Sequence, residues 1–379
     1  MRIAVPAETF ANETRVAATP ETVKKYIAAG FQVVVQKGAG EASSIPDEQF
    51  IEAGATVADS FADVCKGAAL VLKVRSPSKD ETAQLEKNTV VAGLFSPFTN
   101  PLLKSYNDAG LACFSMELIP RISRAQSMDV LSSQANVAGY KAVLLALEHY
   151  RSFMPMLMTA AGTVQPAKVL VMGAGVAGLQ AIATARRLGA MVEAFDVRPA
   201  AKEQVESLGA RFVEVPSEED AEDRGGYAKE MSDAYKQQQA ELIHQHAAVA
   251  DIIITTALIP GRPAPVLITE ETVDAMKPGS VIVDMAVESG GNCPLSEMDS
   301  VWQRDGVTLI GISNIPALMS TDASNLYARN LFNFTNLMLD GESGSLHIDM
   351  DDEIIEASLL CRDGEVMKPQ FFAAAGGEA

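Results

Sequence analysis

Three glycines in the middle of the chain have the spacing of a phosphate-binding turn. Gly173, Gly175 and Gly178 lie in "KVLVMGAGVAGLQAIATARRLGA", after an apolar strand and at the start of a helix. The first glycine permits a tight turn, the second lets a pyrophosphate approach the backbone, and the third lets helix and strand pack closely. Free N–H groups at the helix start favour the phosphates. The pattern predicts dinucleotide binding, with Val176 in the same turn. The alternative is a glycine-rich turn that serves packing alone.

An acidic residue ends the strand that follows this helix. Asp196 closes the segment "MVEAFD". A carboxylate at this place accepts hydrogen bonds from both hydroxyls of the adenosine ribose, whereas a 2′-phosphate would set another negative charge beside it. We therefore expect NAD(H) in preference to NADP(H). Val197 follows in the same turn, and Arg198 either weakens this preference or forms a surface ion pair.

Two later apolar segments belong to the same predicted sheet. They are "DIIITTAL" and "PGSVIVDMAVESGGN", and the second ends in a turn at Gly290 and Gly291. In open parallel sheets, ligands bind beyond the carboxyl ends of the strands. Thr256, Ala257 and Leu258 are therefore candidate cofactor contacts. Their alternative role is core packing plus a turn.

A long polar connection, "SEEDAEDRGGYAKEMSDAY", interrupts this half of the chain. Long loops with glycine hinges inside compact domains are often lids. We expect Tyr227, beside Gly225 and Gly226, to close over bound nucleotide. The alternative is a disordered acidic loop.

The segment "PRISRAQSMDVLSSQANVAGY", residues 120–140, is polar but carries little charge. Solvated faces usually carry lysine and glutamate, so we expect this one to look at a ligand and a partner protein. Gln126 alternatively closes an S-x-x-Q capping box with Ser123. Arg121 and Arg124 could reach a phosphate or a carboxamide oxygen. At about 100° per residue, the segment predicts one amphipathic helix. Its neutral polar face comprises Gln126, Asp129, Ser132, Ser133, Asn136 and Tyr140.

Few residues could carry a proton in a redox reaction. Dehydrogenases that act on alcohols, hydroxy acids or amines need a proton acceptor near the reacting carbon. Hydride transfer between two nicotinamide rings needs none; it needs two C4 atoms at reacting distance and the exclusion of water. The sequence favours the second reaction, because none of its histidines lies in a segment expected at the ligand. These are His149, His244, His246 and His347.

The elements that position these residues alternate between short β-rich runs and helices. This alternation predicts an α/β fold with parallel sheets covered by helices on both faces. Because the pattern restarts at "AKVLVMGAG", we expect two doubly wound, Rossmann-like domains, the second inserted in the first and joined by two long helices. The expected ranges are 1–126 plus 321–379 for the N-terminal domain, 127–150 for a linking helix, and 151–320 for the NAD(H)-binding domain.

Composition excludes several classes of partner. The net charge of −19 argues against nucleic acid and against an anionic membrane surface. No apolar run approaches the roughly 20 residues that span a bilayer, so we expect a cytoplasmic protein without direct membrane insertion. The four cysteines form no C-x-x-C pair and are expected to be buried, reduced thiols. His244 and His246 would point apart on a helix, so no metal site is expected.

Five motifs together point to one family. They are "PRISRAQSMD", "GAGVAGLQAIATARRLGA", "GGYAKEM", "TTALIPGRPAPVLIT" and "GGNCPLSE". With them the chain resembles, over nearly its whole length, the NAD(H)-binding components (domain I, alpha subunit) of proton-translocating NAD(P) transhydrogenases. Some relatives carry membrane spans on the same chain, so this one is either a separately encoded subunit or a piece of a longer one.

The resemblance implies partners and a place in the cell. It implies a homodimer that holds NAD(H), an NADP(H)-binding component, and a membrane-spanning component that couples hydride transfer to proton translocation. Attachment to the inner membrane would then run through the partner subunits.

The resemblance also implies roles for particular residues. The nicotinamide end would be held by Arg121, Gln126, Asp129 and Ser132, with Gln126 closest to the partner's NADP(H). The remaining implied contacts are Gly173, Gly175, Val176 and Gly178 at the pyrophosphate, Asp196 at the ribose, and Gly226, Tyr227, Gln239 and Leu258.

The chain is also similar to alanine dehydrogenase. Arg15 and Lys73 match that family's substrate-binding positions, but its catalytic histidine should fall in "LFSPFTN", which has none. We therefore expect Arg15 and Lys73 to be structural, paired with acids such as Glu13. A self-sufficient amino-acid dehydrogenase and a non-catalytic NAD(H) sensor remain the alternatives.

Overall fold

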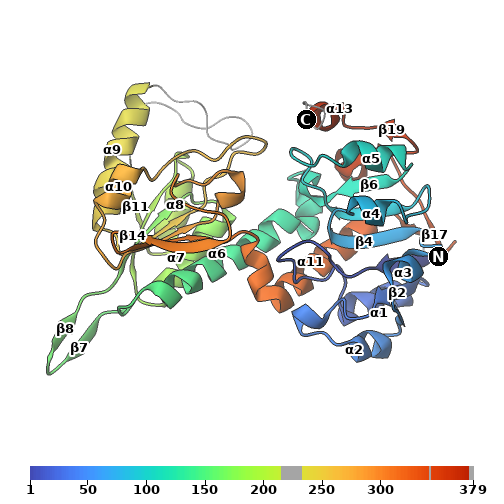
Figure 1. Cartoon of the computed structure of the whole chain (residues 1–379), viewed down its shortest axis with the longest axis horizontal. Helices are drawn as coiled ribbons and strands as arrows, with labels where there is room; N and C mark the ends of the chain where they lie inside the picture. Colours follow the sequence, from blue (N-terminus) through green and yellow to red (C-terminus); the bar gives the residue numbers. More distant parts are fainter. Residues whose placement is uncertain (215–232, 341–342, 375–379) are drawn as a thin grey trace. The chain divides into compact units, whose positions relative to one another are not determined.

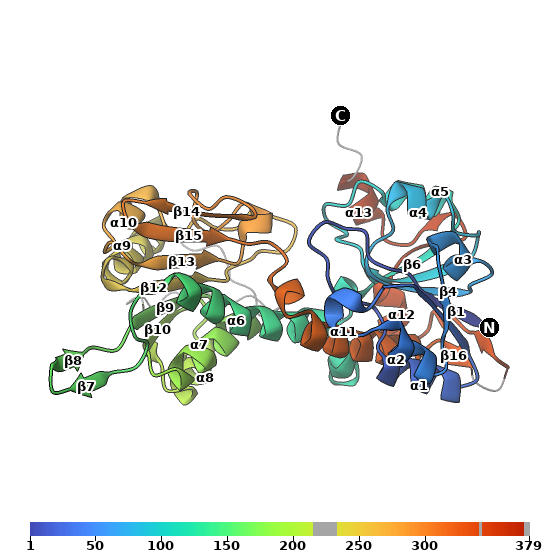
Figure 2. The same cartoon turned by 60° about the horizontal axis from the view of Figure 1, so that its bottom comes forward.

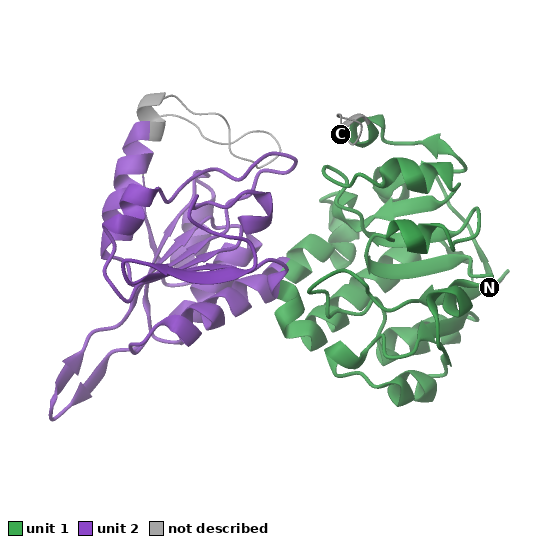
Figure 3. Ribbon diagram, viewed as in Figure 1, with its two compact units in different colours: residues 1–134, 316–379 green, residues 135–315 purple. Residues whose placement is uncertain are grey.

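The computed structural model describes residues 1–214, 233–340 and 343–374. It divides the chain into two compact units (Figure 3). Unit 1 comprises residues 1–134 and 316–379, and unit 2 comprises residues 135–315. The expected fold class is confirmed, because each unit is built on its own mostly parallel sheet and unit 2 is inserted in the sequence of unit 1.

Unit 1 contains an eight-stranded sheet in the order β19-β18-β6-β5-β4-β1-β2-β3. Its strands are β1 (Arg2–Val5), β2 (Gln32–Gln36), β3 (Thr56–Ala58), β4 (Leu70–Arg75), β5 (Val90–Leu94), β6 (Ala112–Ser115), β18 (Leu359–Arg362) and β19 (Glu365–Val366). The first six run parallel, whereas β18 pairs antiparallel with β6 and with β19.

Both faces of this sheet are buried, which explains the nearly continuous apolar strands. Side chains alternate between two cores: Ile3 and Val5 enter one, and Ala4 enters the other. The helices of unit 1 are α1 (Pro20–Ala28), α2 (Asp47–Glu52), α3 (Phe61–Cys65), α4 (Lys79–Thr82), α5 (Leu103–Asp108), α11 (Ser320–Thr335), α12 (Glu353–Ser358) and α13 (Pro369–Ala374). The first core takes residues of α1, α2, α11 and α12, and the second takes residues of α3, α5 and α13.

Unit 2 contains a seven-stranded sheet in the order β11-β10-β9-β12-β13-β15-β14. Its strands are β9 (Lys168–Met172), β10 (Met191–Phe195), β11 (Arg211–Phe212), β12 (Ile252–Thr255), β13 (Val281–Asp284), β14 (Ser300–Arg304) and β15 (Val307–Gly311). Only β14 runs antiparallel within this sheet, as far as the structure describes it. The chain starts at β9, moves outward, and returns to β12 on the other side. This reversal beside β9 is where doubly wound folds bind their ligands.

Helices and a hairpin complete unit 2. The helices are α7 (Val176–Arg187), α8 (Ala201–Ser207), α9 (Asp233–Val249), α10 (Glu270–Asp274) and most of α6 (Val130–His149). Strands β7 (Leu157–Thr159) and β8 (Gly162–Val164) form an antiparallel hairpin that extends away from the sheet of unit 2 (Figures 1 and 2).

The expected domain limits differ from this division. The boundaries after residues 126, 150 and 320 give way to boundaries after 134 and 315. Hydrogen bonds supply the reason at each place. Gln134, in α6, accepts from Arg15 and donates to the Ala323 carbonyl, both in unit 1. The Ala317 carbonyl accepts from the Thr14 hydroxyl, also in unit 1.

Candidate functional site

The glycine turn connects β9 to α7, as its spacing predicts. Gly173 has φ +97°, and a Cβ there would lie 2.5 Å from the Thr256 hydroxyl. A Cβ on Gly178 would lie 1.8 Å from the Gly173 carbonyl oxygen. These two glycines are thus required by the turn and by close packing. Gly175 differs, because a Cβ there would meet no protein atom within 4 Å.

The open space at Gly175 lies at the N-terminus of α7, where the first turn leaves backbone N–H groups without helical partners. The protein therefore leaves room at the place where the motif requires a pyrophosphate, and the residues fit a dinucleotide. Val176, the next residue, lines a hollow of about 330 Å³ together with side chains of α6, α7 and α8.

Asp196 follows β10 and lies beside this turn. Its Oδ2 accepts from the Ala174 N–H at 2.7 Å and from Arg198 Nη2 at 2.9 Å. Its Oδ1 accepts from the Arg198 N–H at 2.8 Å and from Arg198 Nε at 2.9 Å. Burial alone would raise the pKa of the Asp196 carboxyl, but these hydrogen bonds outweigh it and hold the pKa below its usual value. Arg198 therefore takes the second of its two predicted roles, an ion pair, and keeps Asp196 ionised.

The rim after β12 is joined to the glycine turn. The Thr256 hydroxyl lies 3.1 Å from the Gly173 carbonyl, to which it donates a hydrogen bond. Ala257 follows in the same connection, and the Leu258 side chain is 53% exposed. The structure thus brings the predicted residues of β9, β10 and β12 to one edge of the sheet.

Sequence reasoning missed Asn292, which fastens this rim. Its side chain is fully buried. Its Oδ1 accepts from the Ala257 N–H at 3.1 Å, and its Nδ2 donates to the carbonyls of Ala257 at 2.9 Å and Pro265 at 2.8 Å. It therefore closes the loop between residues 257 and 265 at its base. A polar residue directly after a glycine pair at a strand's carboxyl end was the available signal.

Other predicted residues of this half lie apart from the turn. Gln239 is half-buried in α9. Gly225, Gly226 and Tyr227 lie outside the described residues.

The predicted amphipathic helix from Ser123 onward is wrong. Residues Ser123–Met128 form a 3-10 helix, η3, and α6 begins only at Val130. Between them Asp129 is extended, with φ −72° and ψ 91°. A 3-10 helix has three residues per turn, so Ala125 and Met128 point to the same side, and both are buried. A single wheel at about 100° per residue cannot describe both segments.

The capping box expected at Ser123 and Gln126 is also wrong. Ser123 is the first residue of η3, and the N-cap residue, Ile122, makes no side-chain cap. The cap in this region belongs to α6: Asp129 accepts from the Ser132 N–H at 2.9 Å and from the Ser132 hydroxyl. Gln126 and Arg121 are exposed. Two of the four predicted nicotinamide-end residues are thus joined directly, and Gln126 is left accessible.

Arg124 is held within unit 1. Its guanidinium makes a two-pronged ion pair with Asp352, at 2.7 and 2.8 Å. This pair fastens η3 to the start of α12. The predicted reach of Arg124 to a phosphate or carboxamide is therefore not the contact that the structure records.

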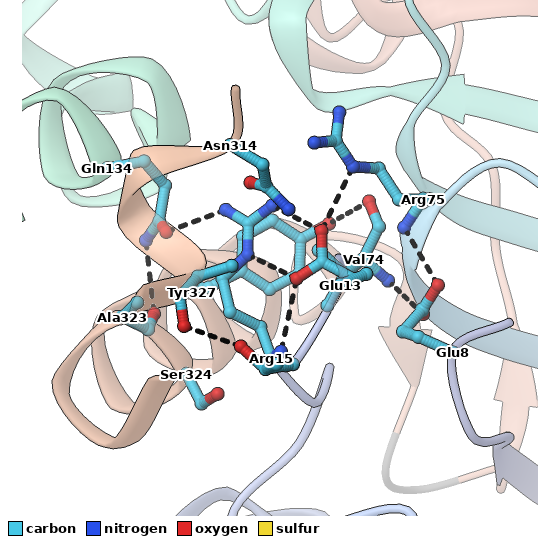
Figure 4. Close-up of polar contacts among 12 residues, drawn as sticks. Glu8, Glu13, Arg15, Val74, Arg75, Gln134, Asn314, Ala323, Ser324 and Tyr327 are labelled. Carbon is cyan, nitrogen blue, oxygen red and sulfur yellow. Dashed lines mark hydrogen bonds and ion pairs between the residues drawn. The ribbon is translucent and has the colours of Figure 1, made fainter. Parts of the chain in front are cut away.

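A cluster of buried charges lies beyond the carboxyl ends of β1 and β4 (Figure 4). Arg15 is 2% exposed and binds Glu13 through Nε and Nη2, both at 2.7 Å. Arg75 Nε donates to the same carboxylate at 3.0 Å. Burial raises the pKa of Glu13, but the two guanidinium groups outweigh it and lower the pKa to about 2. The predicted pairing of Arg15 with Glu13 is confirmed.

Lys73 is neutralised in the same way. Its Nζ lies 3.0 Å from Glu81 and 3.5 Å from Glu8, and its side chain is 1% exposed. Burial would lower the pKa of Lys73, but the two carboxylates raise it above its usual value. The cations that match substrate-binding positions in alanine dehydrogenase are thus each paired with carboxylates of this chain.

Two further properties of the described residues bear on the class of site. Within them, no group of three or more histidine, cysteine, aspartate or glutamate side chains could hold a metal ion. No helix among the same residues is both long and apolar enough to cross a membrane.

Two family models cover most of the sequence. "Alanine dehydrogenase/PNT, N-terminal domain" matches residues 4–138, and "Alanine dehydrogenase/PNT, C-terminal domain" matches residues 142–369. The chain belongs to the alanine dehydrogenase/PNT family.

Relatives within the alanine dehydrogenase/PNT family are similar over the full length. The separately encoded first portion of NAD(P) transhydrogenase subunit alpha from Rhodospirillum rubrum is 49% identical over 97% of this chain and 98% of its own. Alanine dehydrogenase of Halomonas elongata is 30% identical over 97% of this chain and 94% of its own. The resemblance expected from the motifs is confirmed by these matches.

Solved structures agree. The crystal structure of transhydrogenase from Sinorhizobium meliloti has 50% sequence identity and a TM-score of 0.88, and covers 97% of this chain and all of that one. L-alanine dehydrogenase, at 24% identity, has a TM-score of 0.81 over 99% of both chains and shares the fold.

Proposed function

We propose that this chain is the NAD(H)-binding subunit of a proton-translocating NAD(P) transhydrogenase. It presents NADH for direct hydride transfer to NADP⁺ on an NADP(H)-binding component, and a membrane-spanning component couples this transfer to proton translocation. The observation that carries the proposal is the 49% identity, over 97% of this chain, to a relative named as a transhydrogenase subunit.

The glycine turn supports the NAD(H) part of the proposal. In this assignment Gly173, Gly175, Val176 and Gly178 surround the pyrophosphate, and the open space at Gly175 supports it. Asp196, with Val197 and Arg198, binds the adenosine ribose. The further contacts in this assignment are Gly226, Tyr227, Gln239, Thr256, Ala257 and Leu258.

The nicotinamide end is assigned to unit 1. Arg121, Asp129 and Ser132 orient the carboxamide, and Gln126 lies nearest to the partner's NADP(H). The exposure of Gln126 and the ionic cap between Asp129 and Ser132 support this assignment. Bound NADH supplies the hydride. The residues need only hold the ring in place and exclude water, since the transfer requires no acid or base.

We also propose that the chain acts as a homodimer through the β7–β8 hairpin. All six strand residues are exposed. An isolated two-stranded hairpin is at best marginally stable in water, and this one exposes Met158 at 73% and, just before it, Met156 and Phe153 at 54% each. A second copy of the chain is the occupant that closed symmetry favours. The subunit would be attached to the cytoplasmic side of the inner membrane through its partners.

The test is a hydride-transfer assay followed by absorbance. The NADH-loaded chain is mixed with a partner component that holds an NADP⁺ analogue whose reduction has its own absorbance band. A parallel sample receives NADH, pyruvate and ammonium without partner. Turnover only with the partner is expected. Turnover only with pyruvate and ammonium would identify an amino-acid dehydrogenase, and NADH binding with neither activity would identify an NAD(H) sensor.

A further inference from the structure

The chain turns sharply between η3 and α6. η3 ends at Met128, Asp129 is extended, and α6 begins at Val130. The last carbonyl groups of a short helix lack donors within the helix. The Ser127 carbonyl is in this position, one residue after Gln126, so the group that satisfies it also fixes where Gln126 lies.

Two asparagines of α11 satisfy this carbonyl. Asn330 Nδ2 donates to the Ser127 oxygen at 2.8 Å, and Asn333 Nδ2 donates to it at 3.1 Å. The two residues are three apart, so their side chains lie on one face of α11. They differ in burial, since Asn330 is 8% exposed whereas Asn333 lies at the surface.

Asn330 also holds the other side of the turn. Its Oδ1 accepts from the Ser133 hydroxyl at 2.7 Å. One side-chain amide therefore bridges the end of η3 and the first turn of α6. Its orientation is determined, because a carbonyl can only accept a hydrogen bond and so must face the NH₂ group.

The inner face of η3 is fixed by packing. Ala125 and Met128 belong to the apolar core of unit 1, and Arg124 is paired with Asp352. These contacts leave the turn at Asp129 as the part whose geometry depends on Asn330. That turn separates Gln126 from Ser132, which binds the Asp129 carboxylate.

We infer that Asn330 is a positioning residue for hydride transfer, a role that rests on the proposed function. Its amide sets the distance and angle between the segment that carries Gln126 and the helical turn that carries Ser132, without touching either nucleotide. Hydride transfer depends steeply on the placement of the reacting groups, and a shift of about 1 Å can slow a reaction roughly 100-fold. Overall NADH affinity depends far less on this turn, because the pyrophosphate and ribose contacts are assigned to unit 2.

The experiment compares N330A and N330D with N333A in the full chain. N330D keeps the size of the side chain and the acceptor for Ser133 but replaces the donor to Ser127 with an oxygen. N333A is the matched control, since it removes one donor to the same carbonyl and leaves the bridge intact. Three quantities are measured: the single-turnover rate of hydride transfer to the partner component, the Kd for NADH, and Tm.

Both Asn330 variants are expected to slow hydride transfer by about 10-fold or more, with the Kd for NADH changed less than about threefold, whereas N333A stays close to wild type. Wild-type rates in both Asn330 variants would overturn this inference alone. A parallel loss of rate, affinity and Tm would show that Asn330 only stabilises the fold and would also overturn it. A wild-type chain that transfers no hydride would overturn the proposed function and this inference together.

Discussion

At the scale of single residues, the carboxylate of Asp196 already has a full set of donors. Each of its oxygens accepts two hydrogen bonds, three of the four from Arg198. Ribose hydroxyls can bind only if they replace the guanidinium or share its oxygens. The ion pair thus keeps the carboxylate charged and correctly oriented until the sugar takes its place.

D196N is expected to weaken NADH binding by roughly 1.5–3 kcal/mol, the range for hydrogen bonds to charged groups. An asparagine oxygen can still accept from the Ala174 N–H, so the glycine turn should persist and Tm should change little. Fluorescence titration with NADH measures the affinity. An unchanged Kd would remove Asp196 from the ribose site.

The buried Glu13 gives a prediction on pH. Its folded-state pKa is depressed from 4.5 to about 2, so the ionised carboxylate stabilises the fold above pH 4.5. That contribution is lost as the pH falls from 4.5 toward 2. E13Q is expected to lower the free energy of unfolding at pH 7 by roughly 3 kcal/mol. Urea unfolding of the two proteins should converge as the pH is lowered.

Glu21 supplies the matched control for Glu13. Arg329 and Lys25 also lower the pKa of Glu21 to about 2, but its side chain is 42% exposed. Solvent screens such pairs, so E21Q should change stability by less than about 1 kcal/mol. If both variants lose equal stability, burial of the Glu13 cluster is not what makes it matter.

At the scale of elements, the turn between β9 and α7 separates a binding glycine from a packing glycine. Gly175 has φ −74° and ψ −169°, which alanine tolerates, and a methyl group there meets no protein atom. G175A should therefore keep a Tm near that of wild type and bind NADH at least about tenfold more weakly, because the methyl group occupies the pyrophosphate's space.

G178A is expected to do the reverse first. Its Cβ would lie 1.8 Å from the Gly173 carbonyl oxygen, so helix and strand must separate, and stability should fall by about 1–3 kcal/mol. Thermal unfolding and NADH titration of both variants check this contrast. Equal stability losses in the two proteins would mean that Gly175 is also a packing residue.

Elements built from neighbours in sequence were predictable, and those that depend on distant contacts were not. The glycine turn and strands β9, β10 and β12 follow from short apolar runs and glycine spacing. The break at Asp129 did not, because it depends on amides of Asn330 and Asn333 that lie about 200 residues further along the chain. Local periodicity carries no record of such partners.

The predicted site shows the same limit. Gly173, Gly178 and Asp196 lie where their motif places them, since the motif itself encodes the turn. Asn292 was missed because its three hydrogen bonds join residues well apart in sequence. For Arg198, the sequence left two roles open, and only the positions of the Asp196 oxygens decided between them.

At the scale of the whole molecule, unit 2 is one continuous stretch and carries the β7–β8 hairpin. Replacing Met156 and Met158 together with serine should shift the chain toward a monomer, because it removes the apolar surface proposed to bind a second copy. Sedimentation velocity over a range of concentrations measures the change. Met298 is 64% exposed in the same unit but outside the hairpin, so M298S is the control and should leave assembly unaltered. A double variant that remains a dimer would place the interface elsewhere.

The sheet of unit 1 takes its strands from both sides of the inserted unit. Strand β18 covers the hydrogen-bonding edge of β6, yet all of unit 2 lies between them in sequence. On a translating ribosome, β6 therefore emerges long before the strand that covers it, while unit 2 can complete its own sheet in the meantime. An open, apolar strand edge invites pairing with other chains. The interval between the synthesis of β6 and of β18 is thus when the nascent polypeptide is most in need of a chaperone.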